Sequence, residues 1–314
     1  MRSHSFPNHR QSRRTFISRL GAGLALGTVF GPALCRAEDN KEESDAETGI
    51  VGSNIYGWGQ YAQRDHRPLN IPEVISALRD TGYDYLEYYL NIDQPEENAR
   101  FADQLKAKGL RPVSLYTGAR LHEKGKCDEV VAHILAAGKV CARSGFEVIC
   151  CNPDPIGREK TDEELRTQAG ALTGLGRGLK DLGVRLAIHN HTPAMADQAR
   201  EFHYNYDHTQ RDEVGFCFDV HWVWRGGMMP LLAMREYGDR VLTWHLRQSR
   251  NNIWWQDLDT GDIDYSAIAK YAREHNLARR FTVELALEAG TKVTRSVVEN
   301  HRLSREFVRK VFGA

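Results

Sequence analysis

Long hydrophobic runs are missing from the sequence after residue 37. A helix needs about 20 consecutive apolar residues to span a bilayer, and no later segment of the 314-residue chain reaches that length. We therefore expect no stable membrane insertion. The composition, with 41% hydrophobic and 27% charged residues, is typical of a globular protein and excludes a disordered or collagen-like chain.

Cysteine is scarce in the same part of the chain. Five cysteines follow residue 37, an odd number, and their spacing matches neither a disulfide framework nor a zinc knuckle. We predict that all five are packing residues. They are Cys127, Cys141, Cys150, Cys151 and Cys217.

An excess of positive charge is also absent. The chain has 42 basic and 42 acidic residues, but six of the arginines and none of the acidic residues lie within residues 1–37. The rest of the chain is therefore acidic on balance. Because nucleic-acid affinity comes largely from Lys and Arg side chains that neutralise phosphates, we expect no nucleic-acid partner.

The first 37 residues resemble a twin-arginine export signal. The segment SRRTFI at 12–17 precedes a run rich in Gly, Ala and Leu at 20–34, and the following CRA places small residues at the two positions that a signal peptidase reads. A basic arm or a short membrane anchor is the alternative. Residues 38–49 are acidic and nearly free of apolar side chains, as in a solvated linker. We predict export by the twin-arginine pathway and a periplasmic location.

Eight short segments rich in β-branched, aromatic or other apolar residues recur along residues 50–314. Each gap between them has room for one helix, and several gaps show helical periodicity, such as Val74, Ile75 and Leu78 before Gly82. Strands that alternate with helices predict an α/β protein with a parallel sheet, and eight such units predict a closed (β/α)8 TIM barrel. The segments are 50–56, 83–88, 111–116, 146–151, 184–189, 214–219, 241–245 and 281–285.

Glycine positions agree with this architecture. Gly82, Gly109, Gly145 and Gly183 each lie between a helical segment and the next strand. Glycine is favoured there because it readily adopts the left-handed conformation that ends a helix. An open doubly wound sheet is the alternative, but no glycine-rich phosphate loop follows the first segment.

Polar residues end most of the predicted strands. The active site of such a barrel lies at the carboxyl ends of the strands, and residues i and i+2 on a strand share a face. We therefore expect these side chains to meet in one mouth. Their imidazole and carboxylate donors suit one divalent ion of Mn, Zn, Co or Fe. In strand order the terminal residues are Glu87, Tyr116, Asn152, then His189, Asn190 and His191, then Asp219 and His221, then His245 and Glu284.

Four segments of the second half are distinctive: LAIHNHTP, FCFDVHWVWRGG, TWHLRQS with DTGDIDY, and FTVELAL. They resemble the xylose isomerase-like sugar phosphate isomerase/epimerase superfamily, which includes ketose 3-epimerases, inosose dehydratase and abasic-site endonucleases. In that superfamily a Glu, an Asp, a His and a Glu hold the metal. The resemblance implies Asp219, His245 and Glu284 as ligands. His189 stands where the first Glu is usually found, and His191 is its rival on the same strand.

The resemblance implies a divalent-metal-dependent isomerase or epimerase that acts on a sugar or keto-sugar. Such an enzyme removes a proton next to a carbonyl and passes through a metal-stabilised enediolate. Glu284 is the expected base, and His191, Glu87 or His221 is the complementary acid. A lyase or dehydratase of a keto-sugar or inosose stays open on the same site, because the intermediate can also lose a hydroxide.

Five residues near the strand ends are candidates for substrate binding. Tyr116 and Trp222 offer rings on which a sugar can stack. Arg247, Asn190 and His221 offer polar contacts. Export argues against phosphorylated substrates, so we expect a small free or oxidised carbohydrate, such as a keto-glycoside or an inosose. A homo-oligomer stays open at this point.

Two other functions compete with this one. An abasic-site endonuclease needs additional His ligands from earlier strands, where this chain has Glu87, Tyr116 and Asn152. The presence of His189 in place of a ligand Glu keeps a non-catalytic sugar-binding barrel open.

Overall fold

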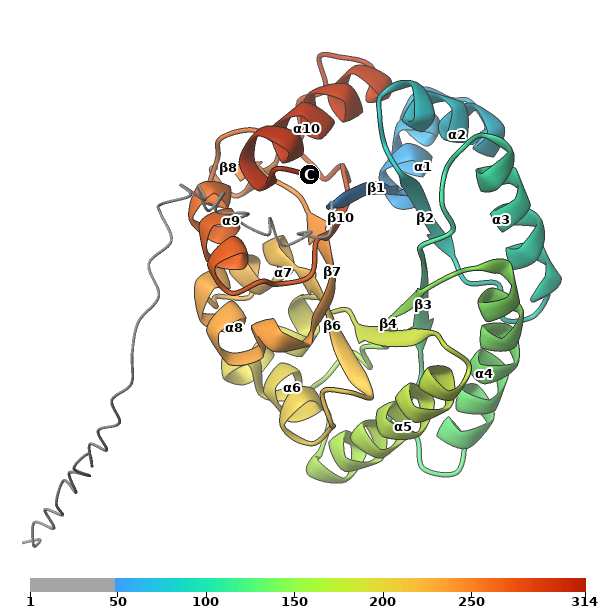
Figure 1. The fold of residues 1–314 in the computed structure, drawn as a ribbon. Helices are drawn as coiled ribbons and strands as arrows, with labels where there is room; N and C mark the ends of the chain where they lie inside the picture. Colours follow the sequence, from blue (N-terminus) through green and yellow to red (C-terminus); the bar gives the residue numbers. More distant parts are fainter. Residues whose placement is uncertain (1–48) are drawn as a thin grey trace, which may run out of the picture. The chain divides into compact units, whose positions relative to one another are not determined.

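Eight parallel strands close into a barrel in the computed structural model, which describes residues 49–314 (Figure 1). The order of these strands along the chain is also their order around the barrel, and the last one pairs with the first. The predicted (β/α)8 TIM barrel is therefore confirmed. The barrel strands are β1 (Ile50–Asn54), β2 (Tyr85–Tyr89), β3 (Ser114–Ala119), β4 (Val148–Pro153), β5 (Arg185–Ile188), β6 (Val214–Asp219), β7 (Val241–Leu246) and β10 (Arg280–Val283).

Helices connect the strands and surround the barrel (Figure 1). Among residues 49–314, no helix combines the length and the apolar character that crossing a membrane requires. The predicted export signal and the predicted linker up to residue 48 lie outside the described residues. The helices are α1 (Ile55–Arg64), α2 (Ile71–Asp80), α3 (Glu96–Ala107), α4 (Cys127–Ser144), α5 (Asp162–Asp181), α6 (Ala196–Asp207), α7 (Val220–Arg225), α8 (Pro230–Tyr237), α9 (Tyr265–Glu274) and α10 (Val297–Phe312).

The strands direct alternate side chains into the barrel and against the helices. On β4, Ile149 and Cys151 belong to the large core that the helices cover. Val148 and Cys150 instead pack in a separate small cluster with Ala187 of β5. This alternation follows from the period of two in a strand. It also brings the inward-facing residues at the strand ends to one mouth.

The predicted glycine helix ends are confirmed. Gly145 follows α4 with a φ of 93°, and Gly82 lies just after α2 with a φ of 81°. Both values lie in the left-handed region, which strains residues that carry a Cβ atom.

The third and fourth predicted strands, 111–116 and 146–151, are placed too early in the sequence. The observed β3 and β4 continue further because Gly118 pairs with Asn152. Gly and Pro disfavour strands locally, but pairing between neighbours decides where these two strands end. As a result, Tyr116 lies within β3 and not at its end.

A short antiparallel hairpin follows β7 and was not predicted. Its strands are β8 (Ser249–Arg250) and β9 (Ile253–Trp254). Two-residue strands produce no periodic sequence signal. The hairpin carries Trp254 to the barrel mouth.

A buried histidine ties α10 to β1. His301 Nδ1 lies 2.8 Å from the Val297 carbonyl oxygen and donates to it, so Nε2 accepts from Ser53 Oγ at 2.9 Å. The Trp58 ring stacks on the imidazole with centroids 4.3 Å apart and donates its N–H to the same hydroxyl. Burial lowers the pKa of His301 to about 4. The ring is therefore neutral in the folded protein at pH 7.

We expect acid to destabilise the fold through His301. Its pKa is about 4 in the folded protein, against 6.5 for an exposed histidine, so the unfolded chain binds the proton first as the pH falls. This contribution to stability is intact above pH 6.5 and is lost towards pH 4, by about 3 kcal/mol. Urea unfolding at several pH values measures it. As the pH falls from 6.5 to 4, we expect the unfolding free energy of His301→Gln to fall less steeply than that of the wild type. Equal slopes would contradict the role of His301 in the acid sensitivity.

Candidate active site

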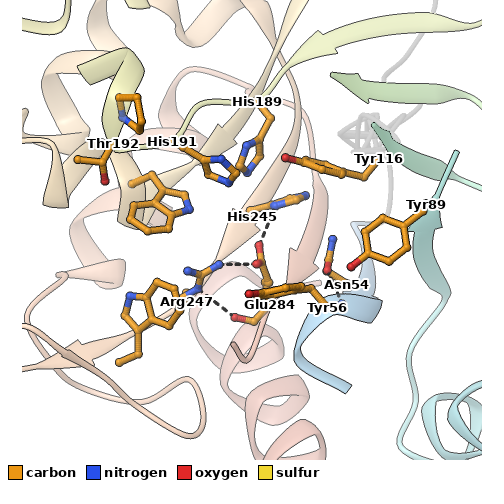
Figure 2. Close-up of a pocket in the computed structure, with 13 residues that line it drawn as sticks. Asn54, Tyr56, Tyr89, Tyr116, His189, His191, Thr192, His245, Arg247 and Glu284 are labelled. Carbon is orange, nitrogen blue, oxygen red and sulfur yellow. Dashed lines mark hydrogen bonds and ion pairs between the residues drawn. The ribbon is translucent and has the colours of Figure 1, made fainter. Parts of the chain in front are cut away.

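A cavity of about 540 Å³ opens at the carboxyl ends of the barrel strands (Figure 2). The fold predicts the active site at this end, and the volume is in the range of small-molecule sites. Aromatic rings form much of the wall. The lining residues are Asn54, Tyr56, Tyr89, Tyr116, His189, His191, Thr192, Pro193, Trp222, His245, Arg247, Trp254 and Glu284.

The four predicted metal ligands meet at this end of the barrel, where His189, His245 and Glu284 line the cavity and Asp219 is completely buried beside them. One donor atom from each lies within 4.8 Å of the other three. His189 Nε2 lies 3.3 Å from Asp219 Oδ2, and His245 Nδ1 lies 3.0 Å from Glu284 Oε2. Donor atoms around a tetrahedral zinc ion are about 3.4 Å apart. This set, which we call the upper donor set, therefore has the right size for one divalent cation.

Several atoms of the upper donor set have no hydrogen-bond partner among the described residues. Both ring nitrogens of His189 and Oδ2 of Asp219 are buried without a hydrogen bond, although Nε2 and Oδ2 lie 3.3 Å apart. Buried polar atoms are normally satisfied, and exceptions often mark the place of an ion or a water. The residues present therefore fit a cation at this point.

The structure separates the two histidines that follow β5. His189 belongs to the upper donor set, whereas His191 lies farther out and lines the cavity. The His191 ring packs edge-on against Trp222, with centroids 5.4 Å apart. Burial lowers the pKa of His191 to about 4, so the side chain is a neutral imidazole at pH 7. It can then accept a proton or, once protonated, donate one.

Glu284 is held between two cationic groups. Arg247 Nη2 lies 2.5 Å from Oε1, and His245 Nδ1 lies 3.0 Å from Oε2 (Figure 2). Burial acts to raise the pKa of Glu284, but the Arg247 guanidinium and His245 hold it well below its usual range. The carboxylate is therefore charged and oriented at neutral pH.

Two tryptophans hold Arg247 in place. Its guanidinium lies over the Trp254 ring at 4.0 Å and over the Trp222 ring at 5.6 Å from the ring centroid. Its Nη1 has no hydrogen-bond partner in the described part of the chain. Arg247 lines the cavity, as predicted for a substrate-binding residue, and keeps one donor free for a ligand.

Glu87 lies below the cavity and does not line it, so the structure does not place it as an acid at the mouth. Because β2 continues to Tyr89, this side chain is mid-strand and completely buried. Its Oε1 accepts from Asn54 Nδ2 at 2.8 Å, and its Oε2 accepts from Ser114 Oγ at 2.7 Å. His245 Nε2 also lies 2.8 Å from Oε1, although its direction is poor for a hydrogen bond.

The two carboxylates decide the protonation of His245. Burial acts to lower the pKa of His245, but the charge of Glu87 and the contact with Glu284 raise it well above its usual range. Each ring nitrogen faces a carboxylate that favours a proton there, Nδ1 towards Glu284 and Nε2 towards Glu87. An ion in the upper donor set would replace the proton on Nδ1, while the charge of Glu87, 2.8 Å away, favours a proton on Nε2.

We expect Glu87→Gln to weaken divalent-metal binding by about 10- to 100-fold, because loss of a partner behind a ligand typically has that effect. Calorimetric titration of Mn²⁺ measures the affinity. Tyr85→Phe is the control, since it removes a buried hydroxyl on the same strand, bonded to Thr282 at 2.7 Å. Equal affinities for wild type and Glu87→Gln would contradict this role.

His221 and Asn190 are predicted to face the mouth, but the structure places neither in the cavity lining. The chain enters α7 directly after Asp219, whose Oδ1 accepts from the Trp222 amide at 2.8 Å. The strand alternation therefore ends, and His221 is buried against Trp224. Asn190 lies between His189 and His191 in the sequence, but its side chain is outside the cavity lining, and its Nδ2 lies 3.5 Å from Met195 Sδ.

Tyr116 and Trp222 lie in the cavity lining, but sequence reasoning missed several other lining residues, among them Asn54, Tyr89 and Thr192. Asn54 ends β1 and caps α1 by accepting from the Tyr56 amide. It was overlooked because the first predicted strand runs past it. Tyr89 follows Glu87 by two residues on β2. Because residues i and i+2 on a strand share a face, this spacing was a sequence signal for Tyr89. No sequence signal singled out Thr192.

A model of the family described as "Xylose isomerase-like TIM barrel" matches residues 75–308. The chain belongs to this family. The match covers most of the barrel and agrees with the closed sheet.

Individual relatives are distant. Inosose dehydratase from Geobacillus kaustophilus is 21% identical over 217 residues, which cover 65% of this chain and 68% of the relative. A sugar phosphate isomerase/epimerase from Parabacteroides distasonis has a TM-score of 0.69 at 20% identity, over 85% of this chain and 95% of that one. The IolI protein with a bound zinc atom has a TM-score of 0.66 at 16% identity, over 84% of this chain and 98% of that one. At these identities, the structural likeness shows the fold alone.

Proposed function

We propose that this protein is a divalent-metal-dependent isomerase or epimerase of a sugar or keto-sugar, and that it removes a proton next to a carbonyl. The observation that carries the proposal is the convergence of His189, Asp219, His245 and Glu284 within 4.8 Å. Structurally similar proteins that include a sugar phosphate isomerase/epimerase and an L-ribulose 3-epimerase support the reaction class. The nearby structure with zinc supports a metal.

The upper donor set would hold the cation. A divalent ion bound there supplies Lewis acidity, which polarises a carbonyl and lowers the cost of removing the neighbouring proton. Two carboxylates and two imidazoles suit Mn, Zn, Co or Fe. Asp219 also caps α7 through its other oxygen, which fixes the direction of its carboxylate.

Glu284 is the proposed base. Arg247 and His245 keep its carboxylate charged and in one orientation, and the side chain lines the cavity where a substrate would lie. His191 is the proposed acid once it has taken up a proton, because its ring lies in the same cavity and apart from Glu284 in Figure 2. Separate positions allow a proton to leave from one side of a carbon and return from another.

Dehydration of a keto-sugar or inosose is the second candidate. Among the described residues that line the cavity, Glu284 is the single carboxylate, and the other titratable groups include His189 and His191. A two-carboxylate epimerase mechanism therefore lacks its second carboxylate. An imidazole is suited to protonate a leaving hydroxyl. The relative named inosose dehydratase favours the same reading.

Deuterium exchange tests the shared first step. The Mn²⁺-loaded protein is incubated in heavy water with ketoses, keto-glycosides and inososes, and products are followed by NMR and mass spectrometry. Deuterium incorporation into a product that has not lost water supports isomerisation or epimerisation. A product that has lost water supports dehydration. A protein that binds metal and sugars but exchanges no carbon-bound proton is a binding barrel, and this result would overturn the proposal.

The predicted export signal extends the proposal to location. We propose that the barrel acts in the periplasm after twin-arginine export. Cell fractionation of the full chain tests this. The control is a double variant that carries both Arg13→Lys and Arg14→Lys, which we expect to stay in the cytoplasm. Equal cytoplasmic retention of the wild type and the double variant would contradict the proposed export.

A further inference from the structure

Two thiols lie inside the barrel below the upper donor set. Cys217 precedes Asp219 by two residues on β6, so both side chains face the interior and the thiol lies about 7 Å deeper along the strand. Cys150 on β4 faces the same interior. Both side chains are completely buried. Their sulfur atoms and one nitrogen of His245 all lie within 4.8 Å of one another.

A small residue on the strand between them lets the two sulfurs approach. β5 separates β4 from β6 in the sheet, and its Ala187, which pairs with Cys150 and with Gly215, packs in the same small cluster as both cysteines. A larger inward side chain at this position would fill the space between the thiols. The arrangement therefore leaves both sulfurs facing one point.

We propose that Cys150, Cys217 and His245 form a second cation site, the lower donor set, that prefers thiophilic divalent ions such as Zn²⁺ and Cd²⁺. Two thiolates and one imidazole are a donor set that zinc accepts in proteins. The nitrogen and oxygen donors of the upper set suit harder ions better. The lower donor set needs no substrate, so it does not depend on the proposed reaction.

The orientation of His245 assigns one ring nitrogen to each set. Nδ1 faces Glu284 in the upper set, and Nε2 lies 2.8 Å from Glu87 Oε1. The other oxygen of Glu87 lies 3.5 Å from Cys150 Sγ. The Nε2 side of the ring therefore faces the level of the thiols. On binding below, the ion forms two bonds to sulfur and one to Nε2, and the two thiol protons and the Nε2 proton pass to solvent.

The shared imidazole makes the two sets compete. A neutral imidazole has one lone pair and one N–H. With an ion on Nε2, the proton stays on Nδ1, where it faces Glu284 and blocks coordination in the upper set. A thiophilic ion below therefore weakens binding of a harder ion above, and the pair of thiols makes the site sensitive to zinc or cadmium.

Cadmium titration of the metal-free protein tests the proposal. We expect ultraviolet sulfur-to-cadmium charge-transfer absorption in the wild type, and two sulfur neighbours in X-ray absorption spectra at the cadmium edge. Preloading with Cd²⁺ lowers the apparent Mn²⁺ affinity more than about 100-fold, beyond the usual effect of losing an outer partner. Cadmium bound through nitrogen and oxygen alone in the wild type would overturn the proposal, whatever the variants do.

Cysteine variants localise the effect. Cys217→Ala and Cys150→Ala each lose most of the charge-transfer band and restore Mn²⁺ affinity in the presence of Cd²⁺. Cys141→Ala is the matched control, because Cys141 is an equally buried thiol on α4 and outside the lower donor set. An unchanged band in folded Cys217→Ala would also overturn the proposal. Neither negative result bears on deuterium exchange by the Mn²⁺-loaded enzyme.

Discussion

Glu284→Gln lowers the deuterium-exchange rate of the Mn²⁺-loaded protein by about 10²- to 10⁴-fold, the usual contribution of a positioned base. The substitution keeps the size of the side chain and removes the charge that accepts the proton. It also removes the partner of Arg247, which lies 2.5 Å away in the wild type. Exchange is measured at saturating metal, so that a weaker ion affinity does not mimic the loss of the base.

Glu288→Gln is the matched control for this prediction. Glu288 follows β10 on the same segment and pairs with Arg225 at 2.8 Å, but it does not line the cavity. We expect its exchange rate to stay within a few-fold of the wild type. Similar losses in Glu284→Gln and Glu288→Gln would mean that the segment, and not the carboxylate, matters.

Asp219→Asn weakens binding of Mn²⁺ by about 30- to several thousand-fold. Removing one charge of a buried charged contact lowers the binding free energy by about 2 to 5 kcal/mol, which corresponds to this fold-change in affinity. Asn preserves the helix cap, because its carbonyl oxygen still accepts from the Trp222 amide. The fold around α7 therefore stays intact, and the loss reports on the charge. Calorimetric titration measures the affinity.

Asp257→Asn separates this effect from general damage. Asp257 is a buried carboxylate that pairs with Arg295, and it lies outside the cavity lining. We expect it to lower thermal stability but to leave the Mn²⁺ affinity unchanged. Unchanged affinity in Asp219→Asn as well would contradict the role of Asp219 as a ligand.

The architecture follows from the sequence because its signals are local and repeated. Helical periodicity before Gly82 and Gly145, and apolar strand segments between such helices, fix the number of units and hence the closed barrel. Exact strand ends do not follow in the same way. Pairing of Gly118 with Asn152 extends β3 and β4, and this contact is between segments that are distant in the sequence.

The site was predictable where a polar residue ends a strand. His189, Asp219, His245 and Glu284 fulfil that condition, and the structure brings them together. Other positions depend on details that no local pattern carries. The helix that starts after Asp219 turns His221 out of the cavity, and the unpredicted hairpin supplies the ring under Arg247. The depth of Glu87 likewise depends on how far β2 continues.

Anomalous diffraction from crystals grown with Mn²⁺ tests the central claim most directly. We expect one strong peak per chain, about 2.0–2.3 Å from one nitrogen or oxygen atom each of His189, Asp219, His245 and Glu284. A peak elsewhere in the barrel, or an ordered mouth with these four side chains and no bound ion at saturating Mn²⁺, would contradict the account.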